Sequence, residues 1–204
     1  MRCYSVYILA TLLALIQLGC RPKELSFKEL AAYAADPENG LRKSETAGGI
    51  LVEVQYRPTD LWVHQELGET MDTASIRKLR NKYSQYDYYI LSLSRDGREA
   101  LTPGGNMGLY SELVQILSFR MGEYITMTTD RGDTIAVSDA NLSRTYGMGH
   151  STDILLVFSR KETEDRDWVQ LNLNEFGLAT GNQRFRFRVK DLRKVPNINF
   201  ITSD

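Results

Sequence analysis

Arg184-Phe-Arg-Phe-Arg-Val-Lys190 is the stretch that says most about the fold, because charged and apolar residues alternate in it without interruption. Side chains of a β-strand point alternately to the two faces of a sheet, so the pattern predicts a strand with one apolar and one cationic face. The stretch from Trp168 to Asn174 alternates in the same way. We therefore expect two neighbouring strands whose apolar residues enter a core and whose polar residues face solvent.

The outward faces of these two strands form the candidate ligand-binding site. Its members are the arginines and amides that would lie side by side if the strands pair: Arg184, Arg186, Arg188, Gln170 and Asn172. Arginine offers planar, bidentate donors and amides both donate and accept, so this surface could bind a sugar or an anionic envelope polymer. The alternative is an ordinary wet face of an antiparallel sheet, neutralised by the acidic run at 162–167.

Most of the second half of the chain has the same β character. Short segments rich in β-branched and aromatic residues predict further strands at 124–129, 134–138, 153–159 and 197–201. No helical periodicity separates these strands, and a parallel doubly wound sheet would need helices between successive strands. The second half therefore indicates antiparallel pairing.

The first half mixes helices with two strands. Ser26 and Glu29 have the spacing of a capping box, which predicts a helix that ends by Pro37. Further helices are expected at 59–67, 72–83 and 109–117, and strands at 50–56 and 88–94.

The helix expected at 72–83 illustrates the periodicity. Ile76, Leu79 and Tyr83 recur at spacings of three and four, so they share one face, which leaves Arg80 on the solvated side.

Together these elements predict an α+β fold. We expect a predominantly antiparallel sheet or sandwich of about eight strands, with three or four helices grouped in the N-terminal half. Residues 25–204 contain no internal repeat, low-complexity tract or long linker, so they are expected to form a single globular domain.

The N-terminus has the layout of a secretory signal peptide. Arg2 and the amino terminus supply positive charge, and the chain from Val6 to Leu18 is almost entirely apolar. This run is shorter than the roughly 20 residues that cross a bilayer, and it stops at Gly19. Residues 1–19 are therefore predicted to be a signal peptide.

The segment Leu15-Ile-Gln-Leu-Gly-Cys20 resembles the lipobox of bacterial lipoproteins, in which a small residue precedes an invariant cysteine. The resemblance implies that Cys20 receives a diacylglyceryl group and that residues 20–24 become a lipidated tether. The alternative is an ordinary signal peptide cut nearby, because Gln17 and Leu18 stand where the family usually has leucine and a small residue.

The same resemblance implies where the protein is found. Bacterial lipoproteins carry two or three acyl chains, and two chains make a stable anchor where one is marginal. We expect an exported protein anchored to a bacterial membrane, the outer membrane being favoured over the inner. Lys23-Glu24 resembles the lysine and acidic residues that follow the cysteine in surface lipoproteins of Bacteroidetes-type bacteria.

The composition argues against several function classes. Lys and Arg number 25 and Asp and Glu number 26, so no global positive field exists to attract nucleic acid. Of the two cysteines, Cys3 lies in the signal peptide and Cys20 is the predicted lipid site, which leaves none for a disulfide, a zinc site or a nucleophile. We predict no cofactor, no metal and no nucleic-acid partner.

Catalytic signatures are weak. His150-Ser151 with Asp153 contains the three residue types of a hydrolase triad, but adjacent side chains rarely face each other. Gly104–Gly108 lacks the Lys-Ser/Thr ending of a phosphate-binding loop.

The sequence therefore favours a non-enzymatic interaction module that binds another envelope component, a protein first and a glycan second. The alternative is a carboxylate-dependent hydrolase with its cleft near residues 104–108 and His150.

Overall fold

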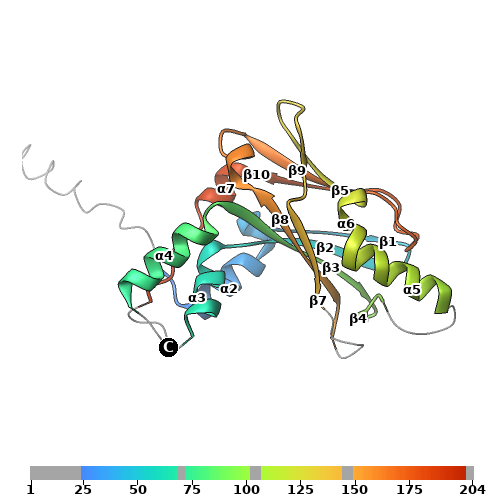
Figure 1. The fold of residues 1–204 in the computed structure, drawn as a ribbon, viewed down its shortest axis with the longest axis horizontal. Coiled ribbons are helices and arrows are strands. Elements are labelled where there is room, and N and C mark those ends of the chain that lie inside the picture. Colours follow the sequence, from blue (N-terminus) through green and yellow to red (C-terminus); the bar gives the residue numbers. More distant parts are fainter. Residues whose placement is uncertain (1–23, 69–71, 102–106, 144–148, 201–204) are drawn as a thin grey trace, which may run out of the picture.

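The computed structural model describes residues 24–68, 72–101, 107–143 and 149–200, which form two antiparallel sheets and several helices (Figure 1). The predicted signal peptide at 1–19, the lipid attachment site Cys20 and most of the glycine-rich loop lie outside the described residues.

The larger sheet has six strands in the order β1-β2-β3-β8-β7, with β4 paired to the end of β3. Its strands are β1 (Arg42–Ala47), β2 (Ile50–Arg57), β3 (Tyr86–Arg95), β4 (Arg98–Glu99), β7 (Asp139–Ser143) and β8 (Thr152–Ser159). Alternate residues of β2, from Ile50 to Tyr56, are buried, as the β-branched pattern of this segment predicts. The strands predicted at 50–56, 88–94 and 153–159 are thereby confirmed.

The smaller sheet has four strands in the order β10-β9-β5-β6. They are β5 (Ile125–Thr129), β6 (Thr134–Ala136), β9 (Trp168–Leu173) and β10 (Gln183–Arg188). β9 and β10 pair antiparallel with Arg186 opposite Gln170 and Arg184 opposite Asn172. The pairing predicted from alternation is confirmed.

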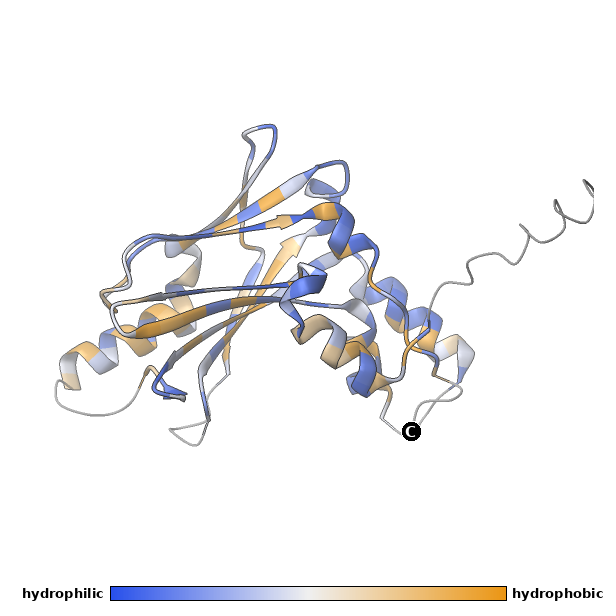
Figure 2. Ribbon diagram, turned by 180° about the vertical axis from the view of Figure 1, so that it is seen from behind, coloured by the Kyte–Doolittle hydropathy of each residue, from blue (hydrophilic) through white to orange (hydrophobic). Residues whose placement is uncertain are grey.

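The core lies between the two sheets. Phe185 and Phe187 of β10 are 2% and 1% exposed and belong to the same apolar cluster as the inward residues of β2, β3 and β8. The ring of Tyr89 on β3 lies 5.4 Å from that of Phe187, centroid to centroid, so aromatic packing joins the sheets directly. Figure 2 shows apolar and polar residues alternating along the strands.

Three helices gather at one end of the molecule: α2 (Phe27–Ala35), α3 (Thr59–Leu67) and α4 (Thr73–Tyr83) (Figure 1). They enclose a second, smaller apolar cluster that includes Leu30, Val63 and Phe200. The predicted capping box of α2 is present, since the Ser26 hydroxyl accepts from the Glu29 N–H while the Glu29 carboxylate accepts from the Ser26 N–H.

A second helical group covers the other end of the core (Figure 1). It consists of α5 (Met107–Gln115), a π-helical segment at Ile116–Arg120 and α6 (Met121–Tyr124). Leu113, Leu117 and Met121 point into the main cluster and are almost completely buried. Near the C-terminus, α7 (Val189–Arg193) follows β10 without a loop, and short 3₁₀ helices occupy Pro37–Asn39 and Arg160–Glu162.

The α+β, mostly antiparallel prediction holds in outline, but its details need correction. The described residues contain ten strands where about eight were expected, because β1, β4 and β7 were missed and the stretch predicted at 197–201 forms no strand over its described residues 197–200. β1 reads Arg-Lys-Ser-Glu-Thr-Ala and contains a single β-branched residue, so its strand conformation comes from pairing with β2 rather than from its own side chains.

Two predictions for the C-terminal region are wrong. The alternating stretch leaves the sheet at Arg188, and Val189–Arg193 forms helix α7, so the helices are not confined to the N-terminal half. Residues 197–200 form no strand, and their contact with the N-terminus is an isolated bridge between Leu25 and Ile198. Ile198 and Phe200 pack into the smaller cluster, which accounts for the apolar character that suggested a strand.

The β1–β2 hairpin supplies a test of this packing. Gly48 and Gly49 both have positive φ angles, +60° and +74°. A Cβ on Gly48 would lie 2.2 Å from the carbonyl oxygen of Ala179, whereas a Cβ on Gly49 would meet nothing within 4 Å. Gly49→Ala should cost about 1–2 kcal/mol from the backbone alone. Gly48→Ala should cost about 1–3 kcal/mol more, measured by urea unfolding. Equal losses in the two variants would contradict the close approach of the hairpin to residues 178–179.

Candidate functional site

The predicted binding residues lie together on the outer surface of β9 and β10. Arg184, Arg186 and Arg188 are exposed, and Gln170 and Asn172 are half-buried between them. We call this surface the cationic face. Its apolar counterpart, on the opposite side of the same strands, is buried in the core.

Arg186 is held flat against the sheet. Its Nε and Nη2 donate to Oε1 of Gln170 at 3.3 and 3.0 Å, and its guanidinium carbon lies 4.0 Å from the centre of the Trp168 ring. A cation over an aromatic face is attracted by the ring quadrupole, so Arg186 has a defined position. Trp168 was not among the predicted site residues, although it shares the outward parity of Gln170 and Asn172.

The charge of the cationic face is only partly neutralised. Arg188 forms an ion pair with Asp191 at 2.6 Å. Within the described ranges, no carboxylate lies within ion-pair distance of Arg184 or Arg186. In this part of the chain the acidic run at 162–167 forms no ion pair with Arg184, Arg186 or Arg188.

Asn172 is hydrogen-bonded to its neighbours within the sheet. Its amide nitrogen donates to the Thr128 hydroxyl on neighbouring strand β5 at 3.2 Å, and its amide oxygen accepts from Gln170 at 2.9 Å. Asn172 thus links side chains across the sheet surface, whereas the guanidinium groups of Arg184 and Arg186 face solvent.

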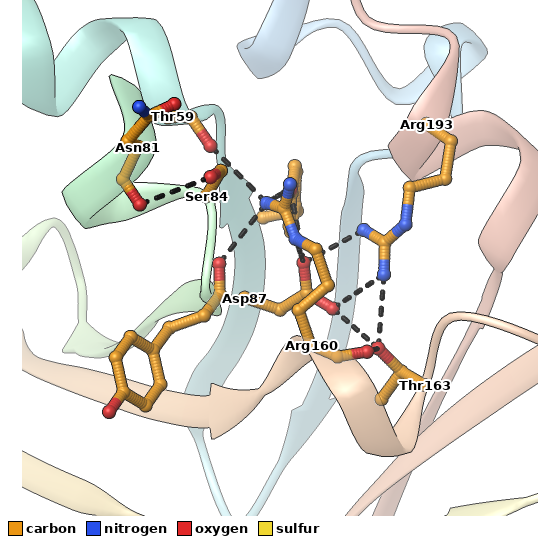
Figure 3. Close-up of polar contacts among 9 residues, drawn as sticks. Thr59, Asn81, Ser84, Asp87, Arg160, Thr163 and Arg193 are labelled. Atoms are coloured by element: carbon orange, nitrogen blue, oxygen red, sulfur yellow. Dashed lines mark hydrogen bonds and ion pairs between the residues drawn. The ribbon is translucent and has the colours of Figure 1, made fainter. Parts of the chain in front are cut away.

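A second polar cluster, which the sequence did not predict, is centred on Asp87 of β3 (Figure 3). Asp87 is fully buried, and its carboxylate accepts from Arg193 at 2.8 Å through each oxygen. It also accepts from Nε of Arg160 at 3.0 Å and from the Thr163 hydroxyl at 2.7 Å. Residues more than 70 positions apart in the chain therefore meet at one carboxylate.

The surroundings of Asp87 keep it ionised. Burial alone would raise the pKa of the Asp87 carboxyl, but the hydrogen bonds and positive charges of Arg193 and Arg160 hold that pKa below its ordinary value. The phenol of Tyr56, whose oxygen is 3.4 Å from Asp87, has its pKa raised by burial and stays protonated. Asp87 is therefore a structural anion that fixes two arginines.

A signal for Asp87 does exist in the sequence. Asp87, Tyr89, Leu91 and Leu93 have the same parity on β3, so the strand that predicts an apolar inward face also places a carboxylate on it. A buried carboxylate requires a cationic partner, but the alternation of β3 does not reveal that the partners come from residues 160 and 193.

A neighbouring ion pair corrects the prediction for Arg80. Asp60 of α3 is 5% exposed and binds Arg80 of α4 in a bidentate manner at 2.8 and 2.6 Å. It also accepts from the N–H of Ile198 at 2.7 Å. Arg80 does not simply point into solvent as the helical periodicity suggested, but connects α4 to α3 and the C-terminal segment.

The three triad residue types near His150 do not assemble. The Ser151 hydroxyl donates to Asp153 at 2.7 Å, while Nδ1 of His150 lies 3.3 Å from the carbonyl oxygen of Gly97. A groove of about 790 Å³ lies nearby, lined by residues within 95–101, 109–113 and 177–179, and Asp96 and Glu99 are among its lining residues.

No group of three or more His, Cys, Asp and Glu side chains in the described ranges lies close enough together to hold a metal ion. None of the helices described is both long and apolar enough to cross a membrane.

Comparisons with known proteins do not identify a family. No family model matches the chain, and no curated protein does either. Among solved structures the chain is similar to a novel protein of unknown function from Burkholderia pseudomallei, with 11% identity over 87% of this chain and 96% of that chain. The TM-score is 0.38, a level at which the likeness supports no argument about fold or function.

The Asp87 cluster predicts an acid-dependent stability. Asp87→Asn should lower the free energy of unfolding at pH 7 by about 3–5 kcal/mol, because it leaves two guanidinium groups without their carboxylate. A carboxyl with a lowered folded-state pKa stabilises the fold above its ordinary pKa of about 3.9 and loses that contribution as the pH falls further. Urea unfolding between pH 7 and pH 3 should therefore show a smaller loss in the variant than in the native chain.

Glu123→Gln is the matched control, because it removes a carboxylate from an exposed pair with Arg120, in which the two side chains are 54% and 48% exposed. It should cost at most about 1 kcal/mol. If Asp87→Asn were no more costly than Glu123→Gln, the central role of Asp87 would be refuted.

Proposed function

We propose that this chain is a lipid-anchored, non-enzymatic protein of the bacterial cell envelope that binds an acidic protein partner through the cationic face. The observation that carries the proposal is the pair of exposed arginines, Arg184 and Arg186, without a carboxylate partner in the described part of the chain. The anchor is the lipid expected at Cys20.

The chemistry of the face favours an acidic partner. Guanidinium groups bind carboxylates in a planar, bidentate manner and lose less hydration on binding than an ammonium group does. Gln170 and Trp168 restrict Arg186 before any partner arrives, so less conformational entropy is lost on association. An acidic glycan offers the same carboxylates and is the alternative occupant of this face.

The start of the folded domain supports a position close to the bilayer. The N–H of Leu25 donates to the carbonyl of Asn197 at 3.0 Å, and the N–H of Asn199 donates to the carbonyl of Leu25 at 3.0 Å. The fold therefore holds the chain five residues after Cys20, and five residues span at most about 17 Å. A partner in the same membrane or directly beside it would be within reach.

The second candidate function is the carboxylate-dependent hydrolase, which the groove beside β4 and α5 favours because Asp96 and Glu99 both line it. Glu99 already accepts a hydrogen bond from the N–H of Gly149 at 2.8 Å, which suits a structural role. The two candidates differ in where a ligand binds. The groove is lined by residues within 95–101, 109–113 and 177–179, whereas the cationic face is formed by the outward side chains of β9 and β10.

Charge reversal tests the cationic face. The double variant Arg184→Glu, Arg186→Glu should lower the affinity for the envelope partner by at least about tenfold, because two attractive charges become repulsive. Pull-down from solubilised envelopes followed by mass spectrometry measures the recovery of the partner. The same double change on α4, Arg77→Glu with Lys78→Glu, alters the net charge equally and should leave recovery intact.

Undiminished recovery with the β10 variant, or equal losses with the two double variants, would contradict binding at the cationic face. If the captured partner is a glycan rather than a protein, digestion of the bound material with protease will leave it intact, and the alternative occupant is then the correct one.

Replacement of the predicted lipidation site tests the anchor. Cys20→Ala should shift the protein from the membrane fraction to the supernatant after ultracentrifugation, because several acyl chains are needed for stable anchoring. Cys3→Ala is the control and should remain with the membranes, since Cys3 lies in the predicted signal peptide. A Cys20→Ala protein that still sediments would exclude anchoring through this residue.

A further inference from the structure

We propose that a small cavity beside Arg160 and Arg193 binds a small oxyanion, either a free ion such as phosphate or the phosphate or carboxylate end of a larger molecule. The cavity has a volume of about 140 Å³. It is lined in part by polar side chains: Tyr56, Thr59, Asp60, Arg160, Arg193 and Asn197. This site is separate from the cationic face and does not depend on the function proposed for that face.

The charge count around the cavity leaves one cation uncompensated. Asp87 forms ion pairs with both Arg160 and Arg193, at 3.0 and 2.8 Å. Among the cavity's lining residues the one carboxylate belongs to Asp60, and Arg80 neutralises it through two hydrogen bonds. Arg160 and Arg193 thus share the single carboxylate of Asp87, so this group of three side chains has a net positive charge that favours the binding of a counter-ion.

Asp87 has no capacity left to bind the second cation more closely. Its two oxygens already accept from both arginines, from the Thr163 hydroxyl and from the Tyr56 phenol. A carboxylate has about four lone-pair sites, so the acceptor side is saturated. A guanidinium group has five N–H donors, and Nη1 of Arg160 has no hydrogen-bond partner in the part of the chain that the structure describes.

The cluster remains accessible from solvent. The side chains of Arg160 and Arg193 are 21% and 25% exposed, while Asp87 behind them is fully buried. An approaching anion therefore meets the guanidinium groups before it meets the carboxylate. Asp60 also faces the cavity, but both of its oxygens are occupied by Arg80 and the N–H of Ile198.

The size of the cavity restricts the ligand class. A water molecule takes up about 30 Å³ in the liquid, so 140 Å³ corresponds to about four or five waters. That space admits a tetrahedral oxyanion or a carboxylate. The hydroxyl of Thr59, which already accepts from Nη2 of Arg160 at 3.2 Å, is one neutral donor on the cavity wall.

Isothermal titration calorimetry on the full chain in detergent tests the site. Inorganic phosphate, sulfate, acetate and glycerol phosphate are titrated separately in a chloride buffer. At least one should bind saturably with a one-to-one stoichiometry. Tighter binding of glycerol phosphate than of inorganic phosphate identifies the end of a larger molecule as the ligand, and the reverse order identifies the free ion.

Two variants locate the binding. Arg160→Gln should weaken it by at least about tenfold, because it removes one of the two charges next to the cavity. Arg186→Gln, on the cationic face, should leave the affinity within about twofold of that of the native chain. Absence of saturable binding by all four anions, or binding that persists in Arg160→Gln and is lost in Arg186→Gln, overturns the proposal.

NMR titration of the native chain tests the site even if Arg160→Gln does not fold. The Nε–H resonances of Arg160 and Arg193 should shift on titration with the anion that binds, with the same dissociation constant as in calorimetry. Shifts confined to Arg184, Arg186 and Arg188 would place the anion on the cationic face and refute the cavity site.

Discussion

The alternation of β10 is the constraint on which both the fold and the candidate site depend. Phe185 and Phe187 fill the space between the sheets, where Phe187 meets Tyr89 of the larger sheet. Because side chains of a strand alternate, burying the phenylalanines forces Arg184 and Arg186 to the opposite surface, and a one-residue slip would bury the cations. The cationic face is therefore fixed in register by the same packing energy that holds the two sheets together.

Arginines only a few residues apart lie in opposite environments. Whether an arginine stays in solvent or packs inward depends on whether a carboxylate is within its reach. Arg184 and Arg186 stay in solvent, whereas Arg193, one turn beyond the end of β10, reaches the buried carboxylate of Asp87. Without Asp87 the interior could not accommodate a guanidinium group. The molecule thus has two separate cationic regions: an exposed one suited to a large acidic partner, and a recessed one suited to a small oxyanion.

The sequence predicted those parts of the molecule that local pattern determines. Alternation placed Phe185, Arg186 and Gln170 on the correct faces, and the capping box at Ser26 located the first helix. It failed where a distant partner decides the outcome. β1 is a strand because it forms backbone hydrogen bonds with β2. The alternating stretch that contains β10 was expected to remain a strand to Lys190, but it becomes helical at Val189. The Asp87 cluster was missed for the same reason, since Arg160 and Arg193 reach Asp87 only in the folded chain.

Site-specific photo-crosslinking in intact cells tests the central claim most directly. Asn174 is exposed and follows the last residue of β9 on the outward side. A photoreactive residue at this position samples the cationic face while leaving all of its arginines in place. The account predicts a crosslinked envelope partner that is absent when the probe is placed at Arg77 on α4. Identical crosslinking patterns from the two positions, or no crosslink from position 174, would contradict it.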